Sequence, residues 1–409
     1  MLSAADNQLF TQVAKGTPCG DWLRSYWFPI AISERWTGLR AQLELDEPVT
    51  FLQQSGTATS FGAGQGTFTG TPLRVRILGE DLVLFRDLSG DLGLLGIDCP
   101  HRSSSLEYGR PREHGLACQY HGWTFDGGGR CLLMPGEPAD SDFKKKVVQP
   151  AYPEREAGGL IWAYLGSGDP PPLALLDVIA REDGVRIVEN FCLWPAHWLQ
   201  IVENSVDQIH TGILHGEGSA RADVWSQIPD VDWEQDADGI STVQIRGDYR
   251  RTNYVRLPTT ILLNQPWPGG RFHWPRYSAI FRTPVDELHT LLFHVTFVPD
   301  VGGERAVLPD GMQWQAAGLV QSLFLQDYRA IVSQGRPVDR TIERLGVTDR
   351  GIVMLRKMIK AGLEAVRDGR APAGTVRAED ADAVLDSARK VTDGLMAASV
   401  AHAPEAAMS

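Results

Sequence analysis

Two short segments of this chain each carry one cysteine and one histidine. Cys99 and His101 form the pattern C-x-H, Cys118 and His121 form C-x-x-H, and 16 residues separate the two segments. Thiolates and imidazoles are common ligands of iron and zinc in proteins. The four side chains therefore predict a metal centre.

The mixed composition of each segment bears on the kind of centre. A structural zinc site with two Cys and two His is the alternative, and it usually groups the two Cys in one knuckle and the two His in another. In a Rieske [2Fe–2S] cluster, two Cys hold one iron and two His hold the other, which raises the reduction potential. Mixed pairs suit a cluster with two different irons, so the pattern favours an electron-transfer centre.

A second group of metal-binding residue types lies about eighty residues further on. Asn204, Asp207 and His210 are spaced three apart and would share one face of a helix. His215 leaves that face unless the helix ends or bends near Gly212. With such a bend, both imidazoles and a carboxylate from elsewhere would form a site for Fe(II) with open coordination positions. The alternative is that both His are surface or capping residues of an amphipathic helix.

Short β runs surround the first two segments. The first Cys-His segment follows the third run and the second precedes Trp123, so both lie on loops at strand ends, where a rigid β scaffold can present a metal cluster. The runs are residues 73–79, 81–87, 92–98 and 158–166. We predict an N-terminal β-rich domain over residues 1–168, with a helical lead-in over 1–30, ending at a Pro-rich boundary.

The rest of the chain predicts a second domain over residues 169–369. The β pattern returns between residues 240 and 300, and apolar residues recur at helical spacing over 311–334 and 352–367. The fold class is therefore α+β. Two segments are weakly specified, namely a Gly/Ser/Thr-rich stretch at 53–71, which reads as a surface loop or insertion, and the tail over 370–409.

Composition excludes several classes of protein. A chain of 409 residues suits about two domains. The formal net charge of −12 argues against a nucleic-acid partner, which requires a basic surface. We find neither a secretory signal in residues 1–16 nor an apolar run long enough for a transmembrane helix. Five Cys do not suggest a disulfide framework, so we expect a cytoplasmic protein that does not bind a membrane.

These motifs together resemble the oxygenase (alpha) component of Rieske non-haem iron oxygenases. The resemblance covers residues 16–367, and the segment 326–346 is similar to the phthalate dioxygenase-like branch. It implies a catalytic domain in which an antiparallel sheet wraps around a helix, the helix-grip or START-like fold. Residues 53–71 look like an insertion relative to the family pattern.

The resemblance also implies a role for each candidate residue. Asp207 is similar to the carboxylate that links a cluster His of one subunit to an iron His of the next, where it would fix the tautomer and orientation of the ring. Asn204 would be a pocket residue beside it. The implied ligands are Cys99, His101, Cys118 and His121 for the cluster, and His210, His215 and Asp327 for a mononuclear Fe(II).

The implied function is that of a terminal oxygenase that hydroxylates or demethylates a small, aromatic substrate with O₂. Electrons from NAD(P)H would arrive through a separate reductase, since the chain has no G-x-G-x-x-G fingerprint of its own. Transfer between subunits implies a homo-oligomer, a trimer or a dimer of trimers. Two alternatives remain open, a Rieske electron-transfer protein without oxygenase activity and a metal-dependent hydrolase that uses Zn²⁺.

Overall fold

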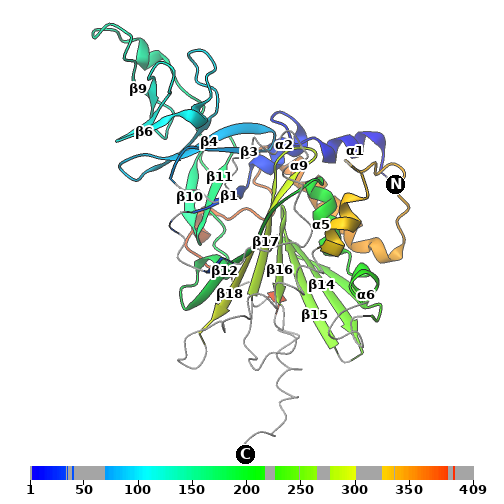
Figure 1. Ribbon diagram of the computed structural model, residues 1–409. Helices are drawn as coiled ribbons and strands as arrows, with labels where there is room; N and C mark the ends of the chain where they lie inside the picture. Colours follow the sequence, from blue (N-terminus) through cyan, green and yellow to red (C-terminus); the bar gives the residue numbers. More distant parts are fainter. Residues whose placement is uncertain are drawn as a thin grey trace, which may run out of the picture.

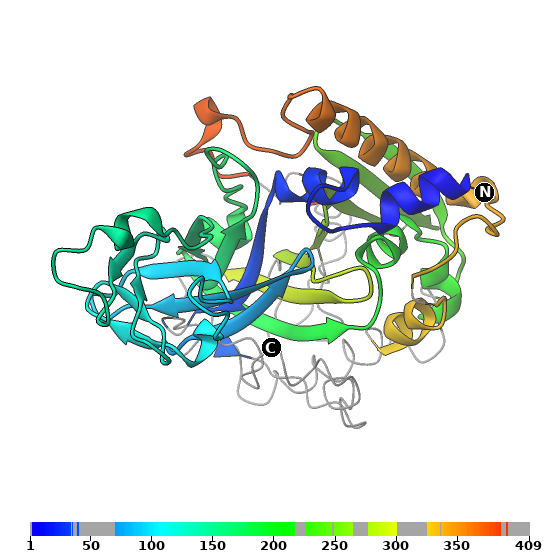
Figure 2. The ribbon, with the colours of Figure 1, turned by 90° about the horizontal axis from the view of Figure 1, so that it is seen from above.

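The computed structural model shows a β-rich lobe beside a larger lobe built on one extended sheet (Figures 1 and 2). The described residues are 2–33, 35, 39–40, 70–216, 226–247, 249–264, 277–300, 325–335, 337–385 and 390–391. The predicted insertion at 53–71 lies almost wholly outside them, as does the last part of the tail. The mixed helix and sheet content confirms the predicted α+β class, whereas the exact domain boundaries stay a prediction.

The β-rich lobe contains three small antiparallel sheets. The predicted runs at 73–79, 81–87 and 92–98 form the second sheet and the run at 158–166 forms β11 of the first, whereas the third sheet was not among the predicted runs. The first sheet pairs β1 (Trp27–Ile32), β11 (Leu160–Tyr164) and β10 (Glu154–Ala157), the second β3 (Leu73–Ile77), β4 (Glu80–Arg86) and β5 (Leu92–Gly96), and the third β6 (Arg110–Arg112), β7 (Gly115–Ala117), β8 (Thr124–Phe125) and β9 (Cys131–Leu133).

An apolar core lies directly beneath the two Cys-His segments. Cys99 and Cys118 belong to this core, so the backbone at each cysteine is held by packing. Gly115 begins β7 with φ +113°, and a Cβ there would lie 2.2 Å from the Phe125 carbonyl oxygen, so only glycine fits. The other core side chains include Val83, Phe85, Leu95, Leu106, Leu116 and Phe125. The loops therefore rest on a rigid support.

An eight-stranded sheet forms the larger lobe. Neighbouring strands pair antiparallel except at the edge, where β2 runs parallel to β12 and ties the N-terminal region to this lobe. The order is β13 (Asp230–Gln235), β14 (Gly239–Arg246), β15 (Tyr249–Arg256), β16 (Thr260–Asn264), β17 (Tyr277–Pro284), β18 (Thr290–Pro299), β12 (Gly184–Trp194) and β2 (Leu39–Arg40).

One helix, α5 (Trp198–Val206), packs against the centre of this sheet and contacts β15, β16 and β17. The predicted arrangement of a sheet around a helix is therefore confirmed. The helix α9 (Arg350–Arg367) covers α5 and confirms the helix predicted over 352–367. The other helices among the described residues are α1 (Ala4–Thr11), α2 (Pro18–Arg24), α4 (Asp177–Ala180), α6 (His210–Leu214) and a helical segment at 325–332, with the 3-10 turns η2 (Leu106–Tyr108), η3 (Phe143–Lys146), η4 (Val347–Asp349) and η5 (Ala378–Asp380). The first part of the helical pattern predicted over 311–334 lies outside the described residues.

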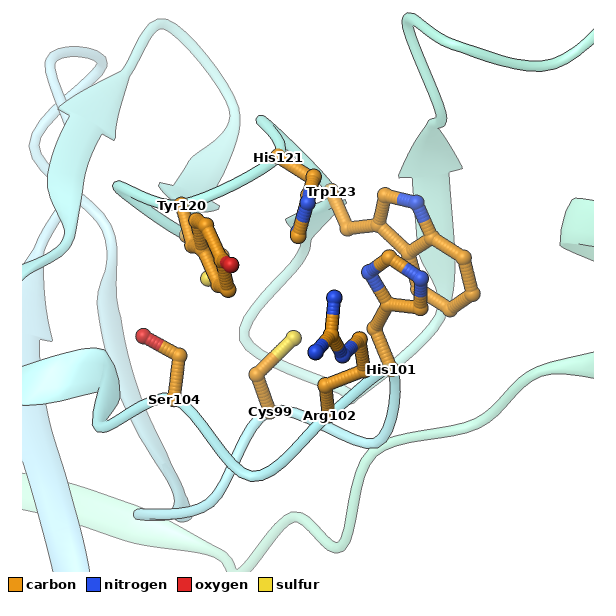
Figure 3. Close-up of a pocket in the computed structure, with 8 residues that line it drawn as sticks. Cys99, His101, Arg102, Ser104, Tyr120, His121 and Trp123 are labelled. Carbon is orange, nitrogen blue, oxygen red and sulfur yellow. The ribbon is translucent and has the colours of Figure 1, made fainter.

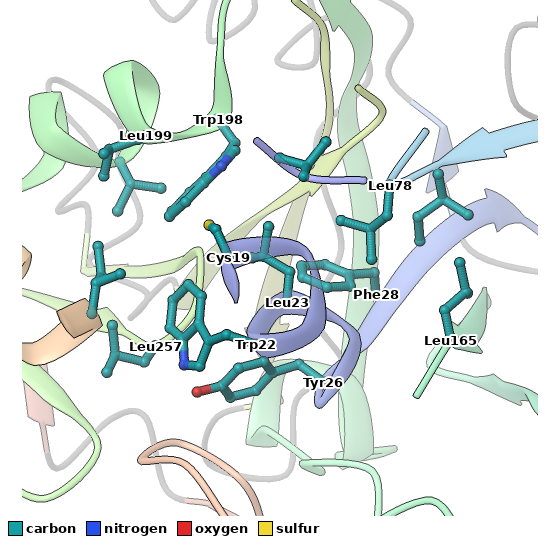
Figure 4. Packing of buried hydrophobic residues seen from close by; sticks show 14 of the residues in the cluster. Cys19, Trp22, Leu23, Tyr26, Phe28, Leu78, Leu165, Trp198, Leu199 and Leu257 are labelled. Carbon is teal, nitrogen blue, oxygen red and sulfur yellow. The ribbon is translucent and has the colours of Figure 1, made fainter. Parts of the chain in front are cut away.

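The largest apolar cluster joins the N-terminal helices to α5 and α9 (Figure 4). Trp22 lies edge-on to Tyr26, with ring centroids 5.4 Å apart, and 5.9 Å from the Trp198 ring. The helical lead-in predicted over residues 1–30 ends earlier than expected, with α2 at Arg24. Trp27 instead begins β1, because the apolar run that follows it pairs with β11.

Gly362 of α9 lies directly against the Trp22 ring. A Cβ at this position would lie 2.4 Å from Trp22 Nε1. We therefore expect Gly362→Ala to destabilise the protein by about 1–3 kcal/mol through overpacking, although alanine favours a helix by about 1 kcal/mol over glycine. Urea unfolding measures the effect. The exposed neighbour Ala361→Gly is the control and should lose only the helix propensity, and a Gly362→Ala variant as stable as the wild type would contradict the close approach.

Candidate metal centres

The two Cys-His segments form facing loops at the tip of the β-rich lobe. In each loop the cysteine backbone closes a turn: Cys99 N–H donates to Ser104 O at 3.0 Å, and Cys118 N–H donates to Trp123 O at 2.8 Å. Figure 3 shows the labelled Cys99, His101 and His121 side chains directed towards a common space. The pocket is lined by Cys99, His101, Arg102, Ser104, Cys118, Tyr120, His121 and Trp123.

Burial differs between the two kinds of ligand. Both cysteines are buried, whereas His121 is exposed and His101 is half-buried. Burial raises the pKa of the Cys99 thiol to about 11, and the neighbouring Cys118 adds to the rise. A thiolate at this place therefore requires a cation beside it. The donor set fits a Rieske cluster, with its cysteine side inside the lobe and its histidine side at the surface.

Trp123 supports the histidine side of the pocket. Its ring stacks on His101, with centroids 4.4 Å apart and an interplanar angle of 10°. The rings of His101 and His121 lie 4.5 Å apart between centroids. The two imidazoles are therefore held as neighbours, as two ligands of one iron must be.

The second group of candidate residues lies where α5 ends. We expected one helix with a bend near Gly212, but the break comes earlier: α5 ends at Val206 and α6 begins at His210. Asp207 has extended backbone angles, and its Oδ1 accepts a hydrogen bond from Ile209 N–H at 3.1 Å. An aspartate side chain that bonds the backbone two residues on competes with the helix, which explains the break.

The break and the short α6 bring three predicted ligands together. His210 Nε2 lies 3.5 Å and His215 Nε2 lies 3.2 Å from Asp327 Oδ1. One donor atom from each of these three residues lies within 4.8 Å of the others, close enough to bind one metal ion. Two imidazoles and one carboxylate suit an Fe(II) ion that keeps open coordination positions for other ligands. The same donor set also suits Zn²⁺.

The opposite ring nitrogens face acceptor groups. His210 Nδ1 lies 3.7 Å from Asp207 Oδ2, beyond hydrogen-bond distance, and has no hydrogen-bond partner among the described residues, whereas His215 Nδ1 donates to Gln326 Oε1 at 2.8 Å. Metal-bound histidines usually use the second nitrogen in this way, which leaves Nε2 free for the metal. Gln326 was missed in the sequence, where its position next to Asp327 was the available signal. The arrangement fits a mononuclear metal centre.

Electrostatics at this centre follow from burial and from these contacts. Burial alone would lower the pKa of His215, but Asp327 and Gln326 raise it above its usual value. Burial alone would raise the pKa of Asp207, but His210 and the Ile209 N–H lower it. Asp207 is therefore ionised at neutral pH. Asn204 joins the group, since its Nδ2 donates to Asp327 Oδ1 at 3.4 Å.

A buried ion cluster holds α5 from behind. Glu203 accepts from Arg356 Nε at 2.6 Å and pairs with Arg340 Nε at 3.4 Å, and Arg356 also pairs with Glu343 at 2.7 Å. Arg340 has no exposed surface. Arg340 and Glu343 belong to the segment that resembles the phthalate dioxygenase-like branch. Their contacts fix the helix that carries Asn204.

We expect Glu203→Ala to destabilise the protein by about 3–5 kcal/mol, because removal of one partner leaves buried guanidinium groups without their counter-charge. Chemical denaturation of the variant measures the loss. Lys360→Met, which breaks the more exposed pair between Lys360 and Asp6 at 3.0 Å, is the control and should have little effect, since surface pairs contribute little. A similar, small loss in both variants would show that the cluster does not hold α5.

The fold and the cluster pocket define a Rieske iron–sulfur protein, and the Rieske [2Fe-2S] domain family matches residues 63–153. The 5,5'-dehydrodivanillate O-demethylase oxygenase subunit of Sphingobium sp. (strain NBRC 103272 / SYK-6) is 32% identical over 395 residues, which cover 92% of this chain and 84% of that protein. The phthalate 4,5-dioxygenase oxygenase subunit of Pseudomonas putida is 28% identical, covering 92% and 89%. The chain belongs to the Rieske non-haem iron oxygenases and is an oxygenase component of the phthalate dioxygenase-like branch.

Solved structures agree on the fold. Pseudomonas putida CBB5 NdmA has a TM-score of 0.63 at 20% identity and covers 86% of this chain and 94% of its own. Dicamba monooxygenase bound to dicamba has a TM-score of 0.61 at 18% identity, covering 85% and 99%. The oxygenase subunits from Sphingobium sp. and Pseudomonas putida match over 92% of this chain, which includes both lobes, and this favours an oxygenase component over an electron carrier. Among the described residues, no helix combines the length and apolar character needed to cross a membrane.

Proposed function

We propose that this protein uses O₂ and electrons from a separate reductase, drawn from NAD(P)H, to hydroxylate or demethylate a small aromatic substrate. The convergence of His210, His215 and Asp327 on one point carries the proposal. We assign these residues to a mononuclear Fe(II), which supplies O₂ activation at its open positions when bound. The cluster ligands are Cys99, His101, Cys118 and His121.

Each remaining residue of the centre has a role in holding the ligands. Gln326 accepts the Nδ1 proton of His215, which would leave its Nε2 lone pair available to a metal, and we assign Asp207, whose Oδ2 lies 3.7 Å from His210 Nδ1, the same role for His210. Asn204 orients the Asp327 carboxylate through its amide. We assign Asp207 a second role as the link to a cluster histidine of the neighbouring subunit in a homotrimer. The outward position of His121 supports this role.

Named relatives support an aromatic substrate. Besides the two oxygenase subunits above, phenoxybenzoate dioxygenase subunit alpha is 31% identical and covers 93% of this chain. The tert-butanol monooxygenase / tert-amyl alcohol desaturase oxygenase subunit, at 29% identity, shows that the branch also includes an enzyme named for an aliphatic alcohol. Three of these four relatives are named for aromatic compounds, so we favour an aromatic substrate.

Reductase-coupled O₂ uptake tests the proposal. The holoenzyme is supplied with a reductase and NAD(P)H, and a panel of aromatic acids, amides and methoxy compounds is added in turn, with products identified by mass spectrometry. We expect O₂ uptake that depends on substrate and matches product formation. Cluster reduction without substrate-dependent O₂ uptake would indicate an electron carrier, and zinc in place of mononuclear iron together with hydrolytic products would indicate a hydrolase.

A further inference from the structure

The ring of Trp123 connects the cluster pocket to the surface of the β-rich lobe. Trp123 stacks on His101, and Phe143 of η3 meets Trp123 in an edge-to-face arrangement, with ring centroids 6.0 Å apart and an interplanar angle of 79°. Trp123 is 7% exposed, whereas Phe143 is 44% exposed. A proposed cluster ligand is therefore joined to an exposed aromatic side chain through one buried ring.

Other residues expose the opposite side of the pocket. The rings of Tyr120 and His121 lie 3.8 Å apart between centroids, both residues are exposed, and the Arg102 guanidinium lies 5.7 Å from the centre of the Tyr120 ring. Figure 3 shows Tyr120 and Trp123 on opposite sides of the pocket. The proposed function uses the His121 side for transfer to a neighbouring subunit, which leaves the Trp123 side for a different partner.

Exposed apolar side chains lie beside Phe143. Leu133 ends β9 and is 52% exposed, and Val148, which forms a β-bridge with Arg130, is 65% exposed. Lys144 Nζ donates to Leu132 O at 3.1 Å and so ties η3 to β9. Figure 1 shows β9 at the outer end of the β-rich lobe, away from the larger sheet. We call this surface the η3 patch, and it consists of Arg130, Leu133, Phe143, Lys144, Lys145, Lys146 and Val148.

The η3 patch is positively charged, although the whole chain has a formal net charge of −12. Two of its cations have carboxylate partners, since Arg130 pairs with Asp126 at 2.7 Å and Lys145 pairs with Asp142 at 2.6 Å. The other two cations, Lys144 and Lys146, make no ion pair among the described residues. The patch therefore combines an exposed apolar centre with a surplus of positive charge.

Such a surface suits a partner with an acidic face. Aromatic and apolar side chains form the centre of many interfaces, and charges of opposite sign at the rim speed association and select the partner. Complexes between redox proteins are commonly small and short-lived, so a patch of this size is sufficient. A second copy of this acidic chain does not offer the complementary charge.

We propose that the η3 patch docks an acidic one-electron carrier protein and that the electron enters the cluster by way of Phe143 and Trp123. In this transfer the carrier loses one electron and the cluster gains it. The inference rests on the proposed function, which requires a separate electron donor, and it names the kind of surface that this donor presents. Electrons would then enter on the Trp123 side of the pocket and leave on the His121 side.

Binding of a plant-type [2Fe–2S] ferredoxin, an acidic one-electron carrier, tests the docking surface. The oxidised ferredoxin is titrated calorimetrically into holoenzyme of verified iron content at low and at high salt. We expect the double variant Lys145→Glu/Lys146→Glu to bind about tenfold more weakly at low salt, and the difference to shrink at high salt because exposed charges are screened. The matched control is Lys15→Glu/Lys357→Glu, which changes the net charge equally at exposed lysines outside the patch and should bind as the wild type.

Stopped-flow reduction of the cluster tests the path through the ring. Phe143→Ala should weaken ferredoxin binding by about fivefold or more, as truncation of an aromatic anchor implies. Phe143→Leu keeps an apolar contact without the ring, so it should bind ferredoxin yet reduce the cluster slowly even at saturating ferredoxin, whereas Phe143→Tyr should restore the rate. Photoreduced deazaflavin, a small uncharged reductant, should reduce the cluster of every variant at the wild-type rate.

Each part of the proposal has an outcome that contradicts it. The docking surface is wrong if the wild type does not bind ferredoxin, if binding does not weaken with salt, or if the patch and control variants bind equally. A wild-type limiting rate in Phe143→Leu would exclude the path through the ring. A changed sedimentation coefficient of Lys145→Glu/Lys146→Glu would assign the patch to a contact between copies of this chain and overturn the proposal. Docking and cluster reduction without substrate-dependent O₂ uptake would refute the proposed function and leave the docking site standing.

Discussion

Asp327→Ala is expected to lose the mononuclear iron and to keep the spectrum of the Rieske cluster. Asp327 Oδ1 lies within 3.5 Å of both imidazole Nε2 atoms, so its removal leaves two histidines without the anionic ligand of the group. Loss of a group that only supports a ligand typically costs 10–100-fold in metal affinity or activity, so the loss of a ligand should exceed about 100-fold.

Iron quantification and electron paramagnetic resonance of the purified variant separate the two centres. The proposed cluster ligands lie in the other lobe, on loops supported by a separate apolar core, so the Rieske signal should remain at the wild-type level. Asp339→Ala is the control, because Asp339 is exposed and bonds only Thr341 in the described structure. If Asp327→Ala kept all of its iron, another residue would have to supply the carboxylate ligand.

Asp207→Ala is expected to keep both metal centres and to lose nearly all turnover. Its carboxylate is ionised and lies 3.7 Å from His210 Nδ1, on the side of the ring away from Asp327. Without it, His210 can still use Nε2, but the proposed link to the cluster of the next subunit is broken. We expect turnover to fall by about 100-fold or more, at the upper end of effects for residues that support a ligand.

Single-turnover kinetics locate the defect. When the pre-reduced variant meets O₂ and substrate, reoxidation of the cluster should slow in proportion to turnover, while iron content stays constant. Asp207→Asn keeps the size and shape of the side chain but removes its charge, and its cluster reoxidation should remain slow. Asp230→Ala is the control: this aspartate is exposed, so the variant should behave as the wild type. Near-normal cluster reoxidation in Asp207→Ala would refute the bridging role.

The amino-acid sequence alone determined the features that depend on neighbours along the chain. Cys99 and His101 are two residues apart, and Cys118 and His121 are three apart, so each pair lies within one tight loop whatever the rest of the fold does. Alternation and apolar spacing likewise located β3, β4, β5 and α9, because side-chain periodicity is a local property of strands and helices. The class of protein followed from these patterns together.

Tertiary structure decided which distant groups meet. Asp327 joins His210 only because its helix packs beside α5, and no spacing rule relates residues so far apart. The helix break at Asp207 arises from a side chain that bonds the backbone in place of the helical pattern, which apolar periodicity does not reveal. Arg282 lies on a strand, and no local pattern reveals that its Nε and Nη1 are buried without a hydrogen-bond partner among the described residues, because burial depends on the surroundings that the fold provides.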